Sequence, residues 1–138
     1  EIITIENYEK RIPIARENFI RAEKEEQITL LEGDAKDVLE TLTEPFDLIF
    51  MDAAKGQYLN FLPRVLELLQ PEGILISDNV LQDGDIIESR FAVTRRNRTI
   101  HKRMREYLYT LTHSEELTTA VLPVGDGITI STKKGRKA

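Results

Sequence analysis

Short apolar runs alternate along the chain with segments in which apolar residues recur every three or four positions. The apolar runs predict strands at residues 1–6, 28–31, 46–51 and 74–77. The segments with helical spacing are residues 8–22, 35–42 and 58–69. This alternation of strand and helix predicts a parallel sheet with helices on both faces.

The pattern changes in the last third of the chain, where two strands follow one another. A longer helix comes first, with an inner face of Ile100, Met104, Tyr107, Leu108 and Leu111. Residues 118–122 and 128–131 then predict two strands, joined through the turn residues Asp126-Gly127. We therefore expect an α/β fold whose sheet is mostly parallel and ends in an antiparallel hairpin, with a basic tail at 134–138.

Composition narrows the class of protein. The 138 residues are 41% apolar and 31% charged, which is enough apolar material for one domain with a core. Cysteine is absent, which excludes disulfides and thiolate metal sites and favours a reducing, cytoplasmic compartment. No apolar stretch approaches the length of a membrane helix. The net charge of −5 does not favour nucleic acid, but residues 90–105 contain seven Arg or Lys and no acid.

Acidic residues follow every predicted parallel strand. Glu6, Asp34 and Asp52 follow the first three strands, and Asp78-Asn79 follows the fourth. In open α/β sheets, ligands bind beyond the carboxyl ends of the parallel strands. A single Asp after a strand is usually a helix cap or a turn residue, but four acidic positions at one edge indicate a ligand site.

Asp52, Asp78 and Asn79 are the candidate metal ligands. One strand–helix–strand crossover separates Asp52 from Asp78, so their side chains can meet across neighbouring strand ends. Carboxylate and amide oxygens suit Mg²⁺ or Ca²⁺. Lys55 lies at the same edge and could help to deprotonate a bound hydroxyl group or hold the resulting oxyanion.

Two further positions suit a nucleoside. An acid in the place of Glu6 hydrogen-bonds ribose hydroxyls, in sites for nicotinamide and for S-adenosyl cofactors alike. The segment Gly33-Asp34-Ala35 lies one strand further out, where small residues and a backbone approach suit an adenine ring.

Three longer motifs carry these candidates. They are Phe46-Asp-Leu-Ile-Phe-Met-Asp-Ala-Ala-Lys-Gly-Gln-Tyr58, Ser77-Asp-Asn-Val-Leu81 and Leu122-Pro-Val-Gly-Asp-Gly127. Together they resemble the metal-dependent class of S-adenosylmethionine O-methyltransferases, which includes the catechol and caffeoyl-coenzyme A enzymes. The resemblance runs over nearly the whole chain and implies a Rossmann-like methyltransferase sheet.

The resemblance also implies a role for each candidate. Asp52, Asp78 and Asn79 would bind Mg²⁺ or another divalent cation, and Lys55 would assist deprotonation of the substrate hydroxyl. The residues implied in binding S-adenosylmethionine are Glu6, Gly33, Asp34, Ala35 and Asp52. Catalysis would then rest on in-line displacement of the methyl group and on positioning of the hydroxyl oxygen.

Within this family, the segments at 52–58 and 123–127 most resemble bacterial tRNA 5-hydroxyuridine methyltransferases. That likeness implies tRNA as a partner and a homodimer. A basic stripe on the later helix could neutralise RNA phosphates, although a run of charge is usually a solvated face. The stripe consists of Arg95, Arg98, Lys102 and Arg105, and the candidate RNA-binding residues are Arg95, Arg96, Arg98, Lys102 and Arg103.

The first strand of the family and its Gly-rich turn have no counterpart in these residues. We therefore expect residues 1–133 to be the C-terminal portion of a methyltransferase domain. The sheet would lack the strand between those that end in Glu6 and Asp52, which leaves two unpaired edges. Alternatively, the two half-sheets close up, or another chain fills the gap.

Other functions stay open at this point. The same chemistry could act on a small catechol-like hydroxyl compound. A non-catalytic remnant would bind RNA without binding the cofactor. A nicotinamide dehydrogenase would explain Glu6 but would leave Asp52, Asp78 and Asn79 without a purpose.

Overall fold

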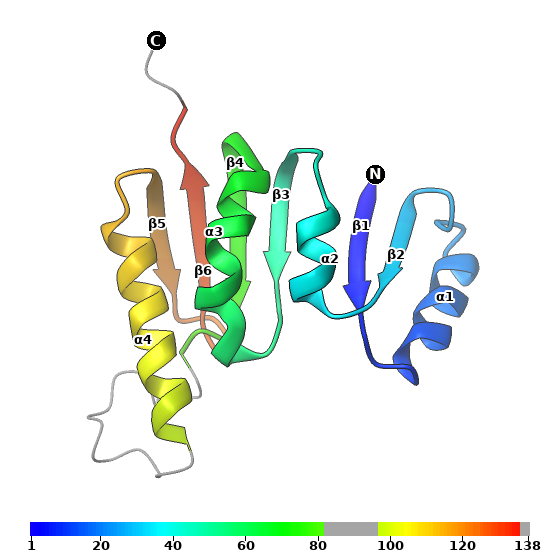
Figure 1. The fold of residues 1–138 in the computed structure, drawn as a ribbon, viewed down its shortest axis with the longest axis horizontal. Coiled ribbons are helices and arrows are strands. Elements are labelled where there is room, and N and C mark those ends of the chain that lie inside the picture. Colours follow the sequence, from blue (N-terminus) through cyan, green and yellow to red (C-terminus); the bar gives the residue numbers. More distant parts are fainter. Residues whose placement is uncertain (82–96, 136–138) are drawn as a thin grey trace. The chain divides into compact units, whose positions relative to one another are not determined.

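The first part of the chain folds around a pair of parallel strands (Figure 1). The computed structural model describes residues 1–81 and 97–135, which fall into two units, Glu1–Thr43 and Glu44–Ala138. The elements of the first unit are β1 (Ile2–Glu6), α1 (Arg11–Arg21), β2 (Ile28–Glu32) and α2 (Ala35–Thr41). Ile2 pairs with Ile28 and Glu6 with Glu32, so the two strands end side by side.

The described part of the second unit contains a four-stranded sheet with two α-helices (Figure 1). Its elements are β3 (Phe46–Met51), the 3-10 turn η1 (Lys55–Gln57), α3 (Tyr58–Leu68), β4 (Leu69–Asp78), α4 (Arg98–His113), β5 (Leu117–Leu122) and β6 (Ile128–Lys133). The strand order is β3-β4-β6-β5. Strands β3, β4 and β5 run in one direction and β6 runs against them.

This topology confirms the predicted α/β methyltransferase fold, with a mostly parallel sheet and an antiparallel hairpin. The hairpin lies differently from a simple edge, because β6 inserts between β4 and β5. Among the described strands, β1 pairs with β2 alone and β3 pairs with β4 alone.

The fourth strand begins earlier than its apolar run predicts. The pattern places Leu69 in a helix and begins the strand at residue 74, whereas β4 already starts at Leu69. Leu69 pairs with Phe46, and the register then shifts so that Ile74 pairs with Leu48. The pairing is irregular between these positions, and local spacing cannot distinguish such an irregularity from a turn.

The core of the second unit lies between α3, α4 and one face of the sheet. That face presents Met51, Leu75, Ser77, Thr129 and Ser131, all of them buried. The residues that α3 and α4 bury are Tyr58, Phe61, Leu62, Val65, Leu68, His101, Met104, Tyr107 and Leu111. The core therefore includes Met51 and Ser77, the residues that directly precede the candidate ligands Asp52 and Asp78.

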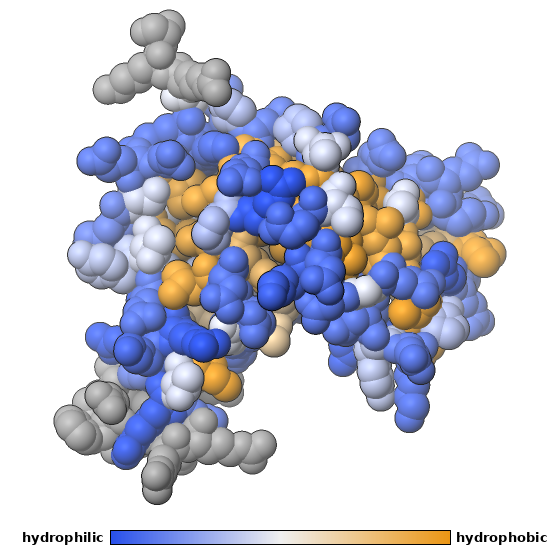
Figure 2. Space-filling model, viewed as in Figure 1, coloured by the Kyte–Doolittle hydropathy of each residue, from blue (hydrophilic) through white to orange (hydrophobic). Residues whose placement is uncertain are grey.

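Other apolar side chains remain at the surface, where Figure 2 shows them among the charged residues. Leu48 and Phe50 on β3 are 52% and 57% exposed. Ile100, which helical spacing assigns to the inner face of α4, is 37% exposed. It lies in the first turn of α4, which extends past the strand ends in Figure 1, so spacing alone overestimates its burial.

Candidate active site

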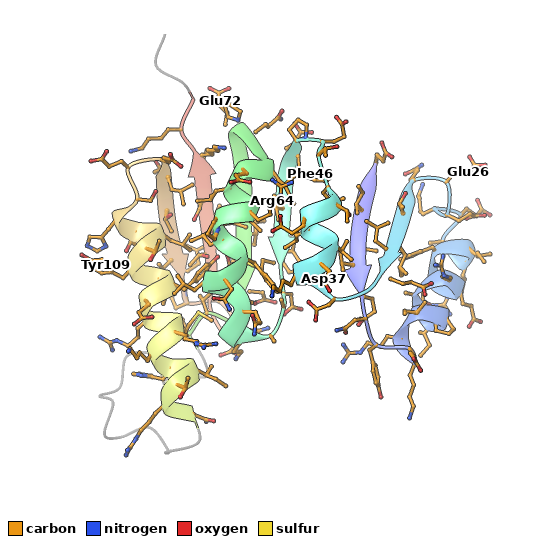
Figure 3. The ribbon with its side chains drawn as sticks, viewed as in Figure 1. Glu26, Asp37, Phe46, Arg64, Glu72 and Tyr109 are labelled. Carbon is orange, nitrogen blue, oxygen red and sulfur yellow. The ribbon has the colours of Figure 1, made fainter. Side chains whose placement is uncertain are left out.

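The carboxyl ends of β3 and β4 bring the candidate metal ligands together. Met51 pairs with Ser77, so Asp52 and Asp78 follow at neighbouring strand ends. Asn79 Nδ2 donates to Asp52 Oδ1 at 3.2 Å, which confirms that these loops meet. Figure 3 labels Phe46, the first residue of β3, and Glu72, which lies in the amino-terminal half of β4.

The backbone turns sharply at Asn79. Its φ is +55°, a left-handed conformation that Asn adopts more readily than most residues other than Gly. The amide N–H of Asn79 donates to Asp78 Oδ1 at 2.7 Å, which ties the two residues together. Non-Gly residues in this region often cluster at functional sites.

Two buried tyrosines contact the ends of the strands that carry the candidate ligands. The Tyr58 hydroxyl donates to Asp78 O at 2.8 Å and lies 3.3 Å from Met51 O, so it joins the two strands that bear the ligands. The Tyr107 ring meets Tyr58 edge-on at 5.4 Å, and the Tyr107 hydroxyl lies 2.6 Å from Ser77 Oγ. The sequence pattern identified Tyr58 and Tyr107 only as apolar helix residues.

Both tyrosines remain protonated near neutral pH. Burial raises the pKa of Tyr107 to about 12, although its hydrogen bond to Ser77 acts in the opposite direction. Burial also raises the pKa of Tyr58, and the nearby charge of Asp52 adds to that increase. A neutral Tyr58 keeps the proton that it donates to the carbonyl of Asp78.

Lys55 is the first residue of η1, and its side chain contacts a residue to which the sequence pattern assigns no role in the site. Its Nζ lies 3.1 Å from Asp126 Oδ2, in the turn between β5 and β6. The sequence predicts a turn at Asp126-Gly127, and this pair also belongs to the motif that ends at Gly127. The next residue of η1, Gly56, accepts a hydrogen bond from Arg103 Nη1 on α4 at 3.0 Å.

The donor set at this edge fits a hard divalent cation. The available oxygens are the carboxylates of Asp52 and Asp78 and the amide oxygen of Asn79. In the described part of the chain, no group of three or more His, Cys, Asp or Glu residues could hold a metal ion. An amide oxygen, water and substrate oxygens would therefore complete the coordination, as Mg²⁺ and Ca²⁺ permit and structural zinc does not.

The candidate nucleoside residues meet at the strand ends of the first unit. Gly33 N–H donates to Glu6 O at 3.1 Å, so the two loops lie side by side. The Glu6 carboxylate accepts the backbone N–H groups of Asn7 and Tyr8 at 3.1 and 2.9 Å. These bonds orient the carboxylate and leave its other oxygen 3.7 Å from Arg11 Nη1.

Asp34 has the structural role that an isolated Asp after a strand usually has. It is the N-cap of α2, and its Oδ1 accepts the N–H of Lys36 at 2.8 Å. Ala35 is the first residue of that helix. Gly33 has φ +146°, and a Cβ there would lie 3.2 Å from Val38 Cγ2, so a larger residue would crowd this turn. Asp52, also implied in cofactor binding, belongs to the second unit.

The predicted basic stripe is only partly described. Arg95 and Arg96 lie outside the described residues. The Lys102 side chain is 74% exposed and its Nζ lies 3.8 Å from Glu106 Oε1. Arg103 uses one guanidinium nitrogen to hold the carbonyl of Gly56.

Comparison with known proteins gives a consistent result. The family model described as O-methyltransferase matches residues 1–134. The chain is 35% identical over 91 residues to a catechol O-methyltransferase from Niastella koreensis, which covers 63% of this chain and 41% of that protein. It is 34% identical over 134 residues to caffeoyl-CoA O-methyltransferase 1 from Eucalyptus globulus, covering 93% of this chain and 53% of that one. The chain thus spans about half the length of these curated relatives.

Solved structures are similar over nearly all of the chain. The SAH-bound methyltransferase PaMTH1 from Podospora anserina superposes with a TM-score of 0.84 at 31% identity, covering 97% of this chain and 61% of that one. An O-methyltransferase from Bacillus cereus in complex with SAH gives 0.83 at 27% identity, covering 96% and 62%.

Proposed function

The chain belongs to the O-methyltransferase family, and we propose that the complete protein transfers a methyl group from S-adenosylmethionine to a substrate hydroxyl. The observation that carries the proposal is the cluster of Asp52, Asp78 and Asn79 on adjacent parallel strand ends, in contact through Asn79 and Asp52. The two SAH-bound relatives support the choice of cofactor.

Each residue at the edge has a defined part in this reaction. Asp52, Asp78 and Asn79 would hold a divalent cation, which when bound lowers the pKa of a substrate hydroxyl. Lys55 would assist deprotonation of the hydroxyl by stabilising the oxyanion beside it. The oxygen forms a bond to the methyl carbon as the carbon–sulfur bond of the sulfonium breaks. The neutral thioether product then leaves.

Removal of divalent cations tests the proposal. Excess EDTA is expected to lower methyl transfer by the complete protein about 1000-fold or more, because charge stabilisation by a metal ion contributes several kcal/mol. Added Mg²⁺ should restore the rate. The rate is measured as the transfer of radiolabelled methyl groups to a catechol and to a 5-hydroxyuridine-containing anticodon stem–loop. Full activity in excess EDTA would contradict the metal-dependent mechanism.

For the substrate, we propose a tRNA 5-hydroxyuridine at the wobble position. Seven Arg or Lys residues without an acid between 90 and 105 support an RNA ligand, and Lys102 is exposed on α4. A small hydroxyl compound is the second candidate, because relatives of this chain carry the names catechol and caffeoyl-CoA O-methyltransferase.

Charge reversal on α4 separates these substrates. Lys102→Glu is expected to weaken RNA methylation and to reduce the salt dependence of RNA binding by about one unit of slope, because one phosphate contact is lost. Methylation of a catechol should stay within about twofold of wild type, since a small substrate needs no such phosphate contact.

The control is Lys24→Glu, an exposed lysine of the first unit. Equal loss of RNA and catechol methylation in Lys102→Glu would contradict an RNA-specific role. Salt-sensitive RNA binding by a wild-type protein that shows no S-adenosylmethionine affinity in calorimetry would instead support the non-catalytic alternative.

A further inference from the structure

The turn between β5 and β6 reaches across the sheet to the candidate active site. Its Asp126 side chain contacts Lys55, which is 71 residues earlier in the chain. The two side chains are 31% and 21% exposed, so the ion pair is partly shielded from water. Shielding of this kind makes an ion pair stronger than one on the open surface.

The backbone of the same turn holds the second ligand-bearing loop. Val80 N–H donates to Gly127 O at 3.1 Å, and Leu81 N–H donates to Asp126 O at 3.0 Å. These bonds anchor the residues that directly follow Asn79. One turn therefore contacts both segments of the site: the one that carries Asp52 and Lys55, and the one that carries Asp78 and Asn79.

The turn is well suited to hold a side chain in place. Gly127 N–H donates to Val124 O at 2.9 Å, which closes the turn on itself. Asp126 is flanked by two glycines in left-handed conformations, with φ of +56° at Gly125 and +83° at Gly127. The carboxylate thus comes from a hydrogen-bonded hairpin turn and not from a loose loop.

We propose that Asp126 is a positioning residue that holds the Lys55 ammonium group at the edge of the sheet where Asp52 and Asp78 lie. This role rests on the proposed methyltransferase function. Lysine has a flexible four-carbon stem and rotatable donors, so a fixed partner decides where its charge lies. Without that partner, the Lys55 ammonium could turn to the nearby carboxylates of Asp52 and Asp78 and compete for their oxygens.

The test is a double-mutant cycle in the complete protein. Asp126→Asn is expected to lower kcat about 10- to 100-fold with a catechol or the hydroxyuridine stem–loop, while the S-adenosylmethionine dissociation constant stays within about twofold. Lys55→Met should lose at least as much. In the Lys55→Met background, Asp126→Asn should cause no further loss, because the carboxylate acts through that lysine.

Two further variants complete the design. Asp126→Glu keeps the charge and should retain kcat several-fold above Asp126→Asn; it also serves if the Asn variant melts without a cooperative transition. Glu67→Gln removes a carboxylate that pairs at 2.6 Å with Arg64 on α3, which Figure 3 labels, and should leave kcat unchanged.

The outcomes are distinct. An unchanged kcat in Asp126→Asn, an equal loss in Asp126→Glu, or the same loss with and without Lys55 would overturn the role of Asp126 while wild-type activity still supports the proposed function. A wild-type protein that methylates neither substrate would overturn the proposed function and, with it, this role.

Discussion

Asp78→Ala in the complete protein is expected to lower metal-dependent methyl transfer by about 1000-fold or more. Asp78 supplies one of two carboxylates in the donor set, and loss of the charge stabilisation by a bound cation costs several kcal/mol, at 1.36 kcal/mol for each tenfold in rate. The substitution also removes the acceptor for the Asn79 N–H at 2.7 Å, which helps to hold Asn79 in its left-handed conformation.

Two further variants test whether the loss in Asp78→Ala comes from the missing metal ligand. Asp78→Asn keeps the size and an acceptor oxygen but removes the charge, so we expect a loss of about 100-fold if the carboxylate acts mainly as a ligand. Asp47→Ala removes an exposed carboxylate from the other end of β3, where it accepts a hydrogen bond from Gln70, and should change the rate by less than about twofold.

The measurement is kcat/KM at several Mg²⁺ concentrations, with the S-adenosylmethionine dissociation constant and melting temperature as checks. Mg²⁺-stimulated activity near the wild-type level in Asp78→Ala would contradict the assigned ligand set. A loss that accompanies a lower melting temperature but no change in Mg²⁺ dependence would indicate a structural role instead.

Gly127→Ala is expected to destabilise the protein by about 3 kcal/mol. A Cβ at Gly127 would clash with Leu81 Cγ and lie 2.7 Å from Leu81 Cβ, so the Leu81 side chain must move. The backbone φ of +83° adds strain for any L side chain. We expect roughly 1–2 kcal/mol from the conformation and about the same or more from overpacking.

Gly125→Ala provides the control for this prediction. Gly125 also has a left-handed φ, +56°, but a Cβ there meets nothing within 4 Å. It should therefore cost only the conformational part, about 1 kcal/mol. Urea unfolding of both variants of the complete protein measures the difference. Equal destabilisation of the two variants would show that the clash with Leu81 contributes nothing to the effect of Gly127→Ala.

Elements of secondary structure were largely predictable, because apolar spacing within a segment depends on residues near one another in sequence. All the predicted strands and helices are present in the described residues, with small shifts at their ends. The start of β4 is the clearest difference. Its first residue, Leu69, is a strand residue because Phe46 pairs with it, and no local pattern contains that partner.

The candidate ligands were predictable for a similar reason. Asp52 and Asp78 each follow a buried strand directly, and parallel pairing of consecutive strands places such residues side by side. Lys55 was predictable from its place three residues after Asp52, and the resemblance to the methyltransferase family implies the same role. Asp126 could not be assigned a partner in this way, because its contact with Lys55 depends on how β6 inserts beside β4.

Local periodicity and the direction of the chain were enough to predict the order of strands and helices and the acidic residues that end the parallel strands. The contacts that support those residues depend on tertiary packing. Tyr58 joins Met51 and Asp78 across 7 and 20 residues, and Asp126 reaches Lys55 across 71. Such contacts form when segments pack into one core, so a local sequence pattern cannot predict them.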